Sequence, residues 1–222
     1  MLVTKSLKMQ KNIVGFLFIS LIFITSSCIK HEVIPPPNST VDLNCSFQGF
    51  INGTNAEYTQ NVAGYNCYNE NLYYNNPSPT LSNCLYTAEI SSIQQSQKIK
   101  LTFGSLQWDA GVSLTPTLTM FNDFHSLNSG IQVPLMDISA MTGANPGVQV
   151  EYWDSNGDRW ETSTADAPGV VNFTILDQAS DNTGDYSLFE CSFSVTVFRQ
   201  DPNQGLLNLT LNNCKFRGWF KR

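Results

Sequence analysis

Apolar and polar residues alternate along most of the chain after residue 40, and this alternation is typical of β-strands with one buried face. In the clearest case, Ile99, Leu101 and Phe103 alternate with polar or small residues between Lys98 and Leu106. Similar patterns predict nine strands, over residues 43–51, 56–62, 85–93, 98–106, 148–152, 160–162, 170–176, 189–198 and 206–220. We therefore expect an all-β fold, an antiparallel β-sandwich of about nine strands, with an open β-barrel as the alternative.

A single helix interrupts the strand pattern between residues 115 and 130. Thr115 suits the capping position and Pro116 the first helical position, and apolar residues then follow at helical spacing, at Leu118, Phe121 and Phe124. The stretch from Asn128 to Gly130 is typical of a helix end. We expect this one short helix to cover one end or one face of the sheet.

The stretch from Gly64 to Leu81 breaks the alternation and is rich in asparagine and tyrosine. It is too polar for a core and too long for a plain hairpin loop, so we expect a surface excursion. Exposed tyrosines offer flat apolar faces to sugar rings, and asparagine amides both donate to and accept from hydroxyl groups. The candidate ligand-binding residues are therefore Tyr65, Tyr68, Tyr73 and Tyr74. The alternative is a solvated loop whose tyrosines pack on the flank of the domain.

The N-terminal segment has the architecture of a secretory signal peptide. Lysines at residues 5, 8 and 11 precede an apolar run of about twelve residues from Ile13 to Ile24, and the small residues 25–27 follow. A membrane-spanning helix needs about 20 apolar residues, so this run is too short to span a bilayer. Cys28 stands directly after the small residues, as the cysteine of a bacterial lipobox does, and we expect Cys28 to be lipidated.

These features divide the chain into three parts. We expect a lipoprotein signal peptide over residues 1–27, the lipidated cysteine with a Pro-rich linker over 28–40, and a single β domain over 41–222. The prolines at 35–37 provide a stiff, extended spacer between a lipid anchor and a folded body.

Secretion would allow disulfides in this chain. Apart from Cys28 the chain has five cysteines, an odd number, so at least one thiol is unpaired or bonds between chains. A bridge between Cys67 and Cys84 would close a loop around the Asn/Tyr-rich stretch. Buried free thiols are the alternative.

Cys191 and Cys214 lie on the last two predicted strands and form a second candidate pair. The hydrophobic pattern aligns these strands so that Cys214 falls opposite Glu190. A bridge to Cys191 therefore requires a β-bulge near Asn212-Asn213.

Asp154, Asn156 and Asp158 occupy alternate positions, the spacing at which a calcium-binding loop offers its first oxygen ligands. Arg159 and Ala165 stand where such a loop needs a glycine and a glutamate. An Asn-Gly pair between two alternating strands also predicts a tight hairpin turn. We expect the turn, with a calcium site at these three residues as the alternative and no other cofactor.

Residues for catalysis are sparse. The chain has two histidines, His31 in the linker and His125 near the end of the helix, where we expect it to cap or to pack. It has no nucleophile elbow, zinc-protease helix or Gly-rich phosphate loop. The carboxylates between Asp154 and Asp185 are too numerous and too turn-like to identify an acid–base pair. We therefore expect no enzymatic activity.

The formal charge of the chain is −6, and removal of residues 1–27 would make it −9, because that segment holds three lysines and no acidic residue. An acidic chain without clusters of lysine and arginine is not suited to nucleic acid. The expected partners are a membrane, through the lipid anchor, and a glycan or an envelope protein.

The order of features resembles that of uncharacterised lipoproteins of the Bacteroidota, which form families of unknown function. The resemblance lies in the lipobox signal, the Pro-rich spacer and four later segments, residues 120–124, 150–160, 190–193 and 209–220. It implies a lipoprotein of the Gram-negative cell envelope, lipid-anchored to the outer membrane on its periplasmic or cell-surface face. No catalytic residues come with the resemblance.

Two functions follow from these expectations. The first is a non-catalytic binding module that captures a carbohydrate or another envelope ligand through the Tyr/Asn-rich stretch. The second is a structural or assembly subunit of an envelope complex, which would pair through an exposed sheet edge or through its aromatic C-terminal strand. Loss of glycan binding on replacement of Tyr73 and Tyr74 by alanine would favour the first.

Overall fold

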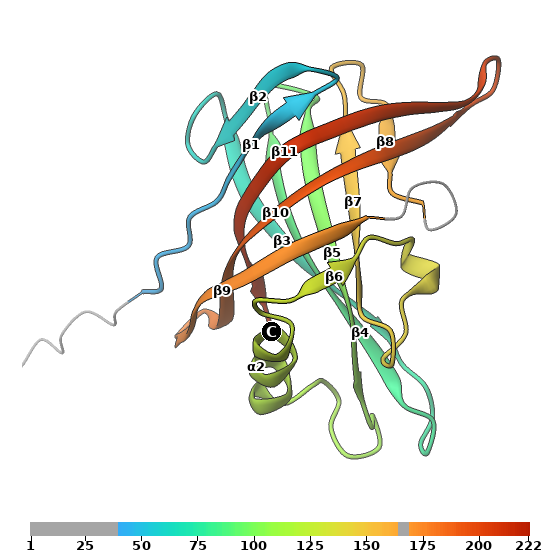
Figure 1. The fold of residues 1–222 in the computed structure, drawn as a ribbon. Helices are drawn as coiled ribbons and strands as arrows, with labels where there is room; N and C mark the ends of the chain where they lie inside the picture. The colour runs from blue at the N-terminus through green and yellow to red at the C-terminus, as the bar shows by residue number, and fades with distance from the viewer. Residues whose placement is uncertain (1–39, 164–168) are drawn as a thin grey trace, which may run out of the picture. The chain divides into compact units, whose positions relative to one another are not determined.

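The structure is a computed structural model that describes residues 40–163 and 169–222. The expected signal peptide, Cys28 and all but the last residue of the expected linker lie outside the described residues. Within them the chain forms one α-helix, α2 (Leu118–Leu127), and one short 3-10 helix, η1 (Ile138–Ala140). The same residues form the strands β1 (Ser46–Ile51), β2 (Thr54–Thr59), β3 (Tyr65–Tyr74), β4 (Ser82–Ser92), β5 (Lys98–Trp108), β6 (Gln132–Pro134), β7 (Gly147–Trp153), β8 (Arg159–Glu161), β9 (Val170–Asp181), β10 (Gly184–Asp201) and β11 (Gly205–Lys221) (Figure 1).

These strands belong to one antiparallel sheet. Nine of them, within residues 40–163 and 169–222, follow one another in the order β2-β1-β11-β10-β8-β7-β5-β4-β3, while β9 pairs with β10 and β6 pairs with β9. The sheet curls into a half-barrel, which brings β11 against β3 and β4 from the far end of the path (Figure 1). The all-β prediction with one short helix is confirmed. The strands form one curled sheet, as in the open-barrel alternative, in place of two separate sheets.

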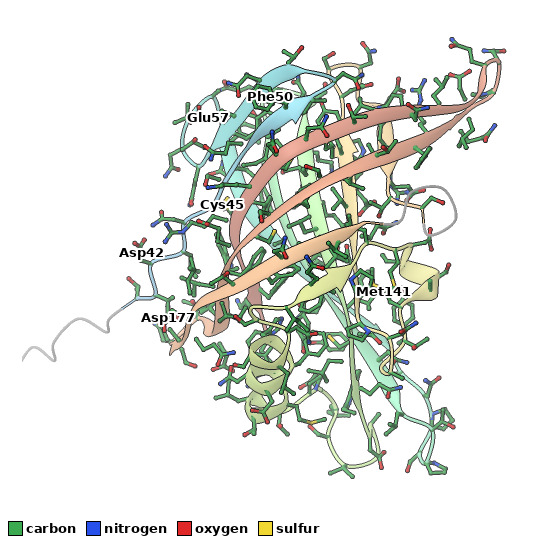
Figure 2. All side chains as sticks on the ribbon, viewed as in Figure 1. Asp42, Cys45, Phe50, Glu57, Met141 and Asp177 are labelled. Atoms are coloured by element: carbon green, nitrogen blue, oxygen red, sulfur yellow. A yellow bond between two sulfur atoms is a disulfide. The ribbon has the colours of Figure 1, made fainter. Side chains whose placement is uncertain are left out.

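The two faces of the sheet differ because side chains alternate along each strand. On the inner face, Phe47, Leu101 and Phe103 are fully buried in the core. On the outer face, Phe50 and Glu57 are exposed (Figure 2). Phe and Leu side chains that leave water stabilise the fold by about 1.5–3 kcal/mol each, so the inner face is the main source of stability.

Helix α2 packs its buried face against the inner side of the sheet. Phe121 lies with its ring centroid 5.2 Å from that of Tyr86 of β4, and Phe124 lies 4.8 Å from Phe103 of β5. The predicted helix is confirmed, but Thr115 and Pro116 precede it. Thr117 is the capping residue, because its extended backbone lets its hydroxyl accept a hydrogen bond from the N–H of Met120 at 3.3 Å. None of the helices among the described residues combines the length and the apolar character needed to cross a bilayer.

The Asn/Tyr-rich stretch is a regular strand, and the predicted surface excursion is wrong. β3 pairs with β4 at every position from Tyr65 to Tyr74 and forms one end of the sheet. The alternation was hidden because the inner face of β3 carries the polar residues Asn69 and Asn71 at positions where other strands carry apolar ones.

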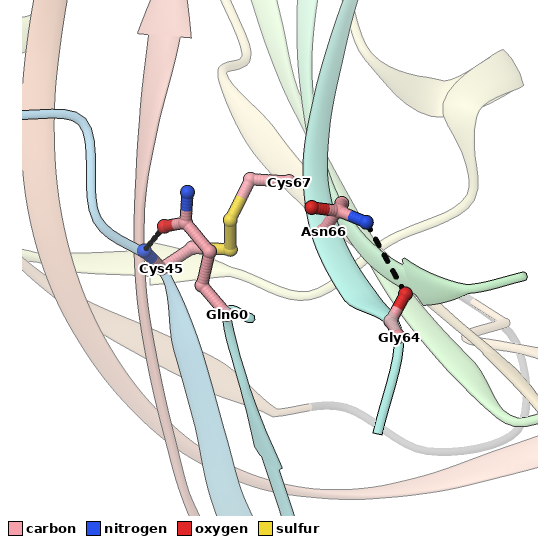
Figure 3. The surroundings of a disulfide bond; sticks show 5 residues. All are labelled: Cys45, Gln60, Gly64, Asn66 and Cys67. Atoms are coloured by element: carbon pink, nitrogen blue, oxygen red, sulfur yellow. Dashed lines mark hydrogen bonds between the residues drawn. A yellow bond between two sulfur atoms is a disulfide. The ribbon is translucent and has the colours of Figure 1, made fainter. Parts of the chain in front are cut away.

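A disulfide joins the two ends of the curled sheet. Cys45, directly before β1, is bonded to Cys67 of β3 (Figure 3). The backbone N–H of Cys45 also donates to the side-chain oxygen of Gln60 at 3.0 Å. Nearby, the rings of Tyr58 and Tyr65 stack with centroids 4.7 Å apart. This covalent and aromatic contact holds β3 beside β1 and β2, with which it forms no ladder.

The C-terminal strand lies inside the sheet. β11 pairs with β10 along almost its whole length and with β1 on its other side from Leu211 to Arg217. This part of β11 therefore has a strand on each side, and assembly through the C-terminal strand stays a prediction. β11 extends beyond β1 at both ends, at the tip of the β10–β11 hairpin and from residue 218 to the end of the strand (Figure 1).

Candidate functional site

A groove of about 530 Å³ crosses the outer face of the sheet over β9, β10 and β11. Small-molecule sites in proteins commonly enclose about 300–1,000 Å³, so the groove has the size of a ligand site. Its polar lining consists of Asn172, Ser192, Ser194, Asn213 and Lys215. We call it the bulge groove.

A β-bulge forms one wall of the bulge groove. Asn212 and Asn213 of β11 together oppose the single residue Ser194 of β10. Asn213 takes a left-handed backbone conformation with φ of 51°, which asparagine tolerates better than most residues. Its N–H donates to the hydroxyl oxygen of Ser194 at 2.9 Å. The extra residue therefore turns its side chain out of the regular ladder, beside the groove.

The other wall lies where the sheet branches. β9 pairs with β10 as far as Phe193, whereas β8 pairs with β10 at Phe198. Ser194 therefore has the bulge on one side and the change of neighbouring strand on the other. Only Ser194 and Asn213 lie at these interruptions, whereas Asn172, Ser192 and Lys215 are direct cross-strand neighbours beside them.

The groove is rich in hydrogen-bonding groups and holds one positive charge. Ser192 and Ser194 offer hydroxyl groups, and Asn172 and Asn213 offer amides that both donate and accept. Lys215 is the only charged residue among the described residues that line the groove. This arrangement can bind several hydroxyl groups together with one carboxylate or similar anion.

The outer face of β4, β5, β7 and β8 carries a second polar surface with a different character. Lys98 pairs with Glu89 at 3.3 Å and Lys100 with Glu151 at 2.9 Å. Arg159 contacts the carboxylates of both Glu151 and Glu161, at 2.5 and 2.6 Å. We call this surface the charged ladder; it consists of Glu89, Lys98, Lys100, Glu151, Arg159 and Glu161.

Trp153 lies on the charged ladder, with the Lys98 ammonium 4.0 Å from its ring centroid. Its ring face is therefore already in contact with a cation of the same chain. The charged ladder has three positive and three negative residues, each in an ion pair, so it offers less unpaired charge than the bulge groove.

The four candidate tyrosines do not form one surface. Tyr65 is buried and stacks on Tyr58, and Tyr73 packs edge-on against Trp108, with centroids 5.8 Å apart. Tyr68 and Tyr74 belong to the opposite, outer face of β3 and are about half exposed. Residues of a strand alternate between its two faces. Tyr65 and Tyr73 occupy odd positions and Tyr68 and Tyr74 even ones, so the four tyrosines are divided between the two faces.

Asp154, Asn156 and Asp158 form the tight turn between β7 and β8, so the predicted hairpin is confirmed. One Asp154 oxygen accepts from the N–H groups of Asn156 and Asp158, at 2.9 and 3.0 Å, and the other accepts from Trp160 at 3.0 Å. Asp158 pairs with Arg199 of β10. The calcium site stays a prediction, and an ion there would compete with these contacts.

The predicted Cys67–Cys84 bridge is wrong. Cys67 is bonded to Cys45, while Cys84 pairs with Tyr73, six residues along β3 from Cys67. Six residues of a strand span about 20 Å, far beyond the reach of a disulfide. Burial raises the pKa of the free Cys84 thiol to about 12, so Cys84 is protonated and unreactive at neutral pH.

Cys191 and Cys214 are also free, so the second predicted pair does not form in the structure. A bulge, which such a bridge would require, is present at Asn212-Asn213, but Cys214 lies opposite Phe193, and not opposite Glu190 or Cys191. Burial raises the pKa of Cys214 to about 12 and the pKa of Cys191 well above its usual value.

His125 is fully buried among aromatic rings. Its ring centroid lies 5.1 Å from that of Tyr86, 4.5 Å from Phe121 and 5.0 Å from Phe220. Its Nδ1 is 2.8 Å from the carbonyl oxygen of Phe121. Burial lowers the pKa of His125 to about 3, so the imidazole is neutral near pH 7 and acts as a packing residue.

Sequence reasoning missed the bulge groove. Its polar residues come from three strands and lie up to 43 positions apart, from Asn172 to Lys215. The one local signal was Asn212-Asn213, since asparagine pairs favour bulges and left-handed backbone.

Comparison of the chain with protein-family models, with curated proteins and with solved structures finds no match. The resemblance to Bacteroidota lipoproteins therefore stays a prediction.

Proposed function

We propose that this chain is a non-catalytic carbohydrate-binding module, tethered to the bacterial cell envelope, whose binding site is the bulge groove. The proposal rests on one observation: a groove of ligand size, lined by polar residues, lies where β11 has a bulge and where β9 stops pairing with β10. Bulges are enriched next to functional sites because they re-aim side chains.

The chemistry of the lining favours a sugar that bears an acidic group. Serine hydroxyls and asparagine amides match the donors and acceptors of sugar hydroxyl groups. Lys215 supplies one ammonium group, which suits a single carboxylate, as in a uronic acid. The formal charge of −6 for the whole chain disfavours densely charged polyanions and so favours a lightly charged glycan.

The absence of catalysis is also part of the proposal. The described residues that line the groove include no carboxylate and no histidine. Hydrolysis of a glycosidic bond usually needs two carboxylates on either side of the bond. A bound glycan would therefore be held without being cleaved.

The tether is proposed from the N-terminal sequence. A basic segment, a short apolar run and small residues lead to Cys28, which we propose to be lipidated and to anchor the chain in the outer membrane. Mass spectrometry of the mature N-terminus tests this. An acylated Cys28 supports the anchor, and release of a Cys28→Ser variant from the membrane fraction agrees with it. An unlipidated chain that begins elsewhere contradicts it.

The groove is tested by measuring binding of the full chain to oligosaccharides with and without uronic acid residues. We expect a preference for the uronic acid oligosaccharides and a loss of about tenfold in affinity for Lys215→Ala, since one charge-assisted hydrogen bond is removed. The matched control is Arg217→Ala, which removes an exposed cation two residues along the same strand, outside the groove lining. Equal losses for the two variants, or no binding by the unchanged chain, would contradict the proposal.

A further inference from the structure

The two edges of the β10–β11 hairpin differ at its tip. On the β10 side, Phe198 pairs with Glu161 of β8. Arg199 forms an ion pair with Asp158 and lies 5.2 Å from the ring centroid of Trp160. The β10 edge is therefore covered by β8 and the turn before it.

Between Gly205 and Thr210, the edge of β11 that faces away from β10 has no strand beside it. We call it the β11 edge. The backbone oxygen of Thr210 accepts from the N–H of Asn52 at 2.9 Å, and its N–H donates to the Asn52 side chain at 3.0 Å. Backbone groups on one edge of a strand belong to alternate residues, so those of Leu206 and Asn208 face the same way. In the part of the chain that the structure describes, no hydrogen bond is made by these groups of Leu206 and Asn208.

This edge also lacks the features by which proteins protect edge strands. Such edges usually carry a charge, a proline or a bulge. The segment Gly205–Thr210 has no charged residue and no proline, and the bulge begins only at Asn212. The strands at the two ends of the sheet path do carry a charge, Glu57 in β2 and Glu70 in β3.

The hairpin tip is held in a defined shape. The side-chain oxygen of Asp201 accepts from the N–H groups of Asn203 and Gln204, at 2.8 and 2.9 Å. Gly205 follows with φ of 82°, the left-handed conformation that closes a three-residue hairpin loop with a bulge. An edge that is ordered before binding loses less conformational entropy when it pairs.

We propose that the β11 edge pairs with the same edge of a second copy of this chain, so that two molecules form a continuous antiparallel sheet. A twofold axis through Leu207 sets Leu206 of each copy opposite Asn208 of the other and satisfies all four exposed backbone groups on each edge. This dimer is independent of the carbohydrate proposal.

Charge and exposure favour a second copy as the occupant. Each copy has a formal charge of −6, so self-association needs a contact without charged groups, and this segment provides one. Leu206 is 53% exposed and lies on the same outer face as Phe50, which is 42% exposed. In this register Leu206 of each copy lies beside Asn208 of the other, and the two Leu206 side chains are diagonal neighbours that partly shield each other from water.

Sedimentation equilibrium of the full chain in density-matched detergent tests the dimer. We expect a monomer–dimer equilibrium in the micromolar range for the unchanged chain. Leu206→Lys places like charges across the axis and should raise the dimer dissociation constant about tenfold or more. The matched control is Val62→Lys, which replaces an apolar residue of similar exposure, 57%, in the β2–β3 turn and should leave the dimer intact.

A second edge variant distinguishes loss of the dimer from loss of folding in Leu206→Lys. Asn208→Lys changes an exposed residue of the same edge without touching the contacts with β10, and circular dichroism confirms that each variant is folded. Dimer loss in both folded edge variants, but not in Val62→Lys, supports the proposal. A monomeric unchanged chain, or a dimer that persists in either folded edge variant, overturns it.

Discussion

The two polar surfaces on the outside of the sheet are built from different residues and leave different groups free. In the charged ladder, Lys100 lies directly opposite Glu151, and diagonal or same-strand contacts pair the other charged side chains, so that each one meets an opposite charge. In the bulge groove, Lys215 lies opposite the uncharged residues Ser192 of β10 and Gln48 of β1, and it forms no ion pair among the described residues.

The difference shows that the residues placed next to each other on neighbouring strands decide which polar groups stay free to bind a ligand. A regular antiparallel ladder places complementary side chains about 5 Å apart, and they satisfy each other. In the bulge groove the neighbours Asn172, Ser192 and Lys215 carry one charge among them, so no ion pair forms there, and the adjacent bulge adds Asn213 to the polar lining. Polar side chains are therefore paired with one another on the charged ladder and available for recognition in the bulge groove.

The largest expected effect is the loss of folding stability on acidification. It tests whether one of the two outer surfaces or the buried His125 controls stability at mildly acidic pH. The folded-state pKa of His125 is about 3, against 6.5 for an unperturbed histidine. Between pH 6.5 and pH 3 the unfolded state binds more protons than the folded state, because His125 is protonated only in the unfolded state. The free energy of unfolding is therefore highest above pH 6.5 and falls as the pH falls towards 3. We expect a loss of about 1.4 kcal/mol for each pH unit within this window.

Urea unfolding from pH 8 to pH 5 measures that slope. The His125→Leu variant keeps an apolar side chain among the aromatic rings and should show an almost flat profile. If it lost as much stability as the unchanged chain, the charged surfaces, and not the buried imidazole, would be responsible.

Removal of one charge from each outer surface tests the comparison itself. Glu151 has a side chain only 2% exposed and pairs with both Lys100 and Arg159. Glu151→Gln keeps the volume but leaves two cations without their partner, and we expect the free energy of unfolding to fall by about 2–3 kcal/mol, because the cations are partly exposed. Lys215→Ala in the bulge groove should change it by less than about 0.5 kcal/mol.

Chemical denaturation of both variants at pH 7 makes this measurement, and Glu57→Gln on the exposed edge of β2 is the control for loss of a carboxylate. Equal destabilisation by Glu151→Gln and Lys215→Ala would show that charged side chains contribute to stability equally on the two surfaces, which would contradict the comparison.

The smallest expected effect concerns the bulge. Asn213 has φ of 51°, where a β-branched residue is strained. We expect Asn213→Val to lower the free energy of unfolding by about 1–2 kcal/mol and Asn213→Gly to leave it almost unchanged. Lys215→Val, two residues along in regular register, is the control and should be tolerated. A tolerated Asn213→Val would mean that the bulge is not fixed by the backbone conformation in the structure.

Much of the fold followed from local pattern. The alternation from Lys98 to Leu106 predicted β5, and the Asn-Gly pair predicted the β7–β8 turn. β3 was missed because its inner face carries Asn69 and Asn71 at positions where other strands carry apolar residues. Local alternation identifies a strand only where one face meets an apolar core.

The candidate site was beyond local pattern. The hydrophobic alignment of the last two strands set Leu211 opposite Phe193, whereas the structure sets it opposite Val195. Both alignments keep the apolar residues on one face, because a shift by two residues preserves the alternation. The bulge groove depends on that register and on the position where β9 leaves β10, and neither is encoded in a short segment.

Hydrogen–deuterium exchange of the full chain, with and without a uronic acid oligosaccharide, tests the central claim most directly. The account predicts slower exchange in the segments around Asn172, Ser192–Ser194 and Asn213–Lys215, with no change around Glu151 and Arg159 in the charged ladder. Slower exchange in the charged ladder with an unchanged bulge groove would contradict it.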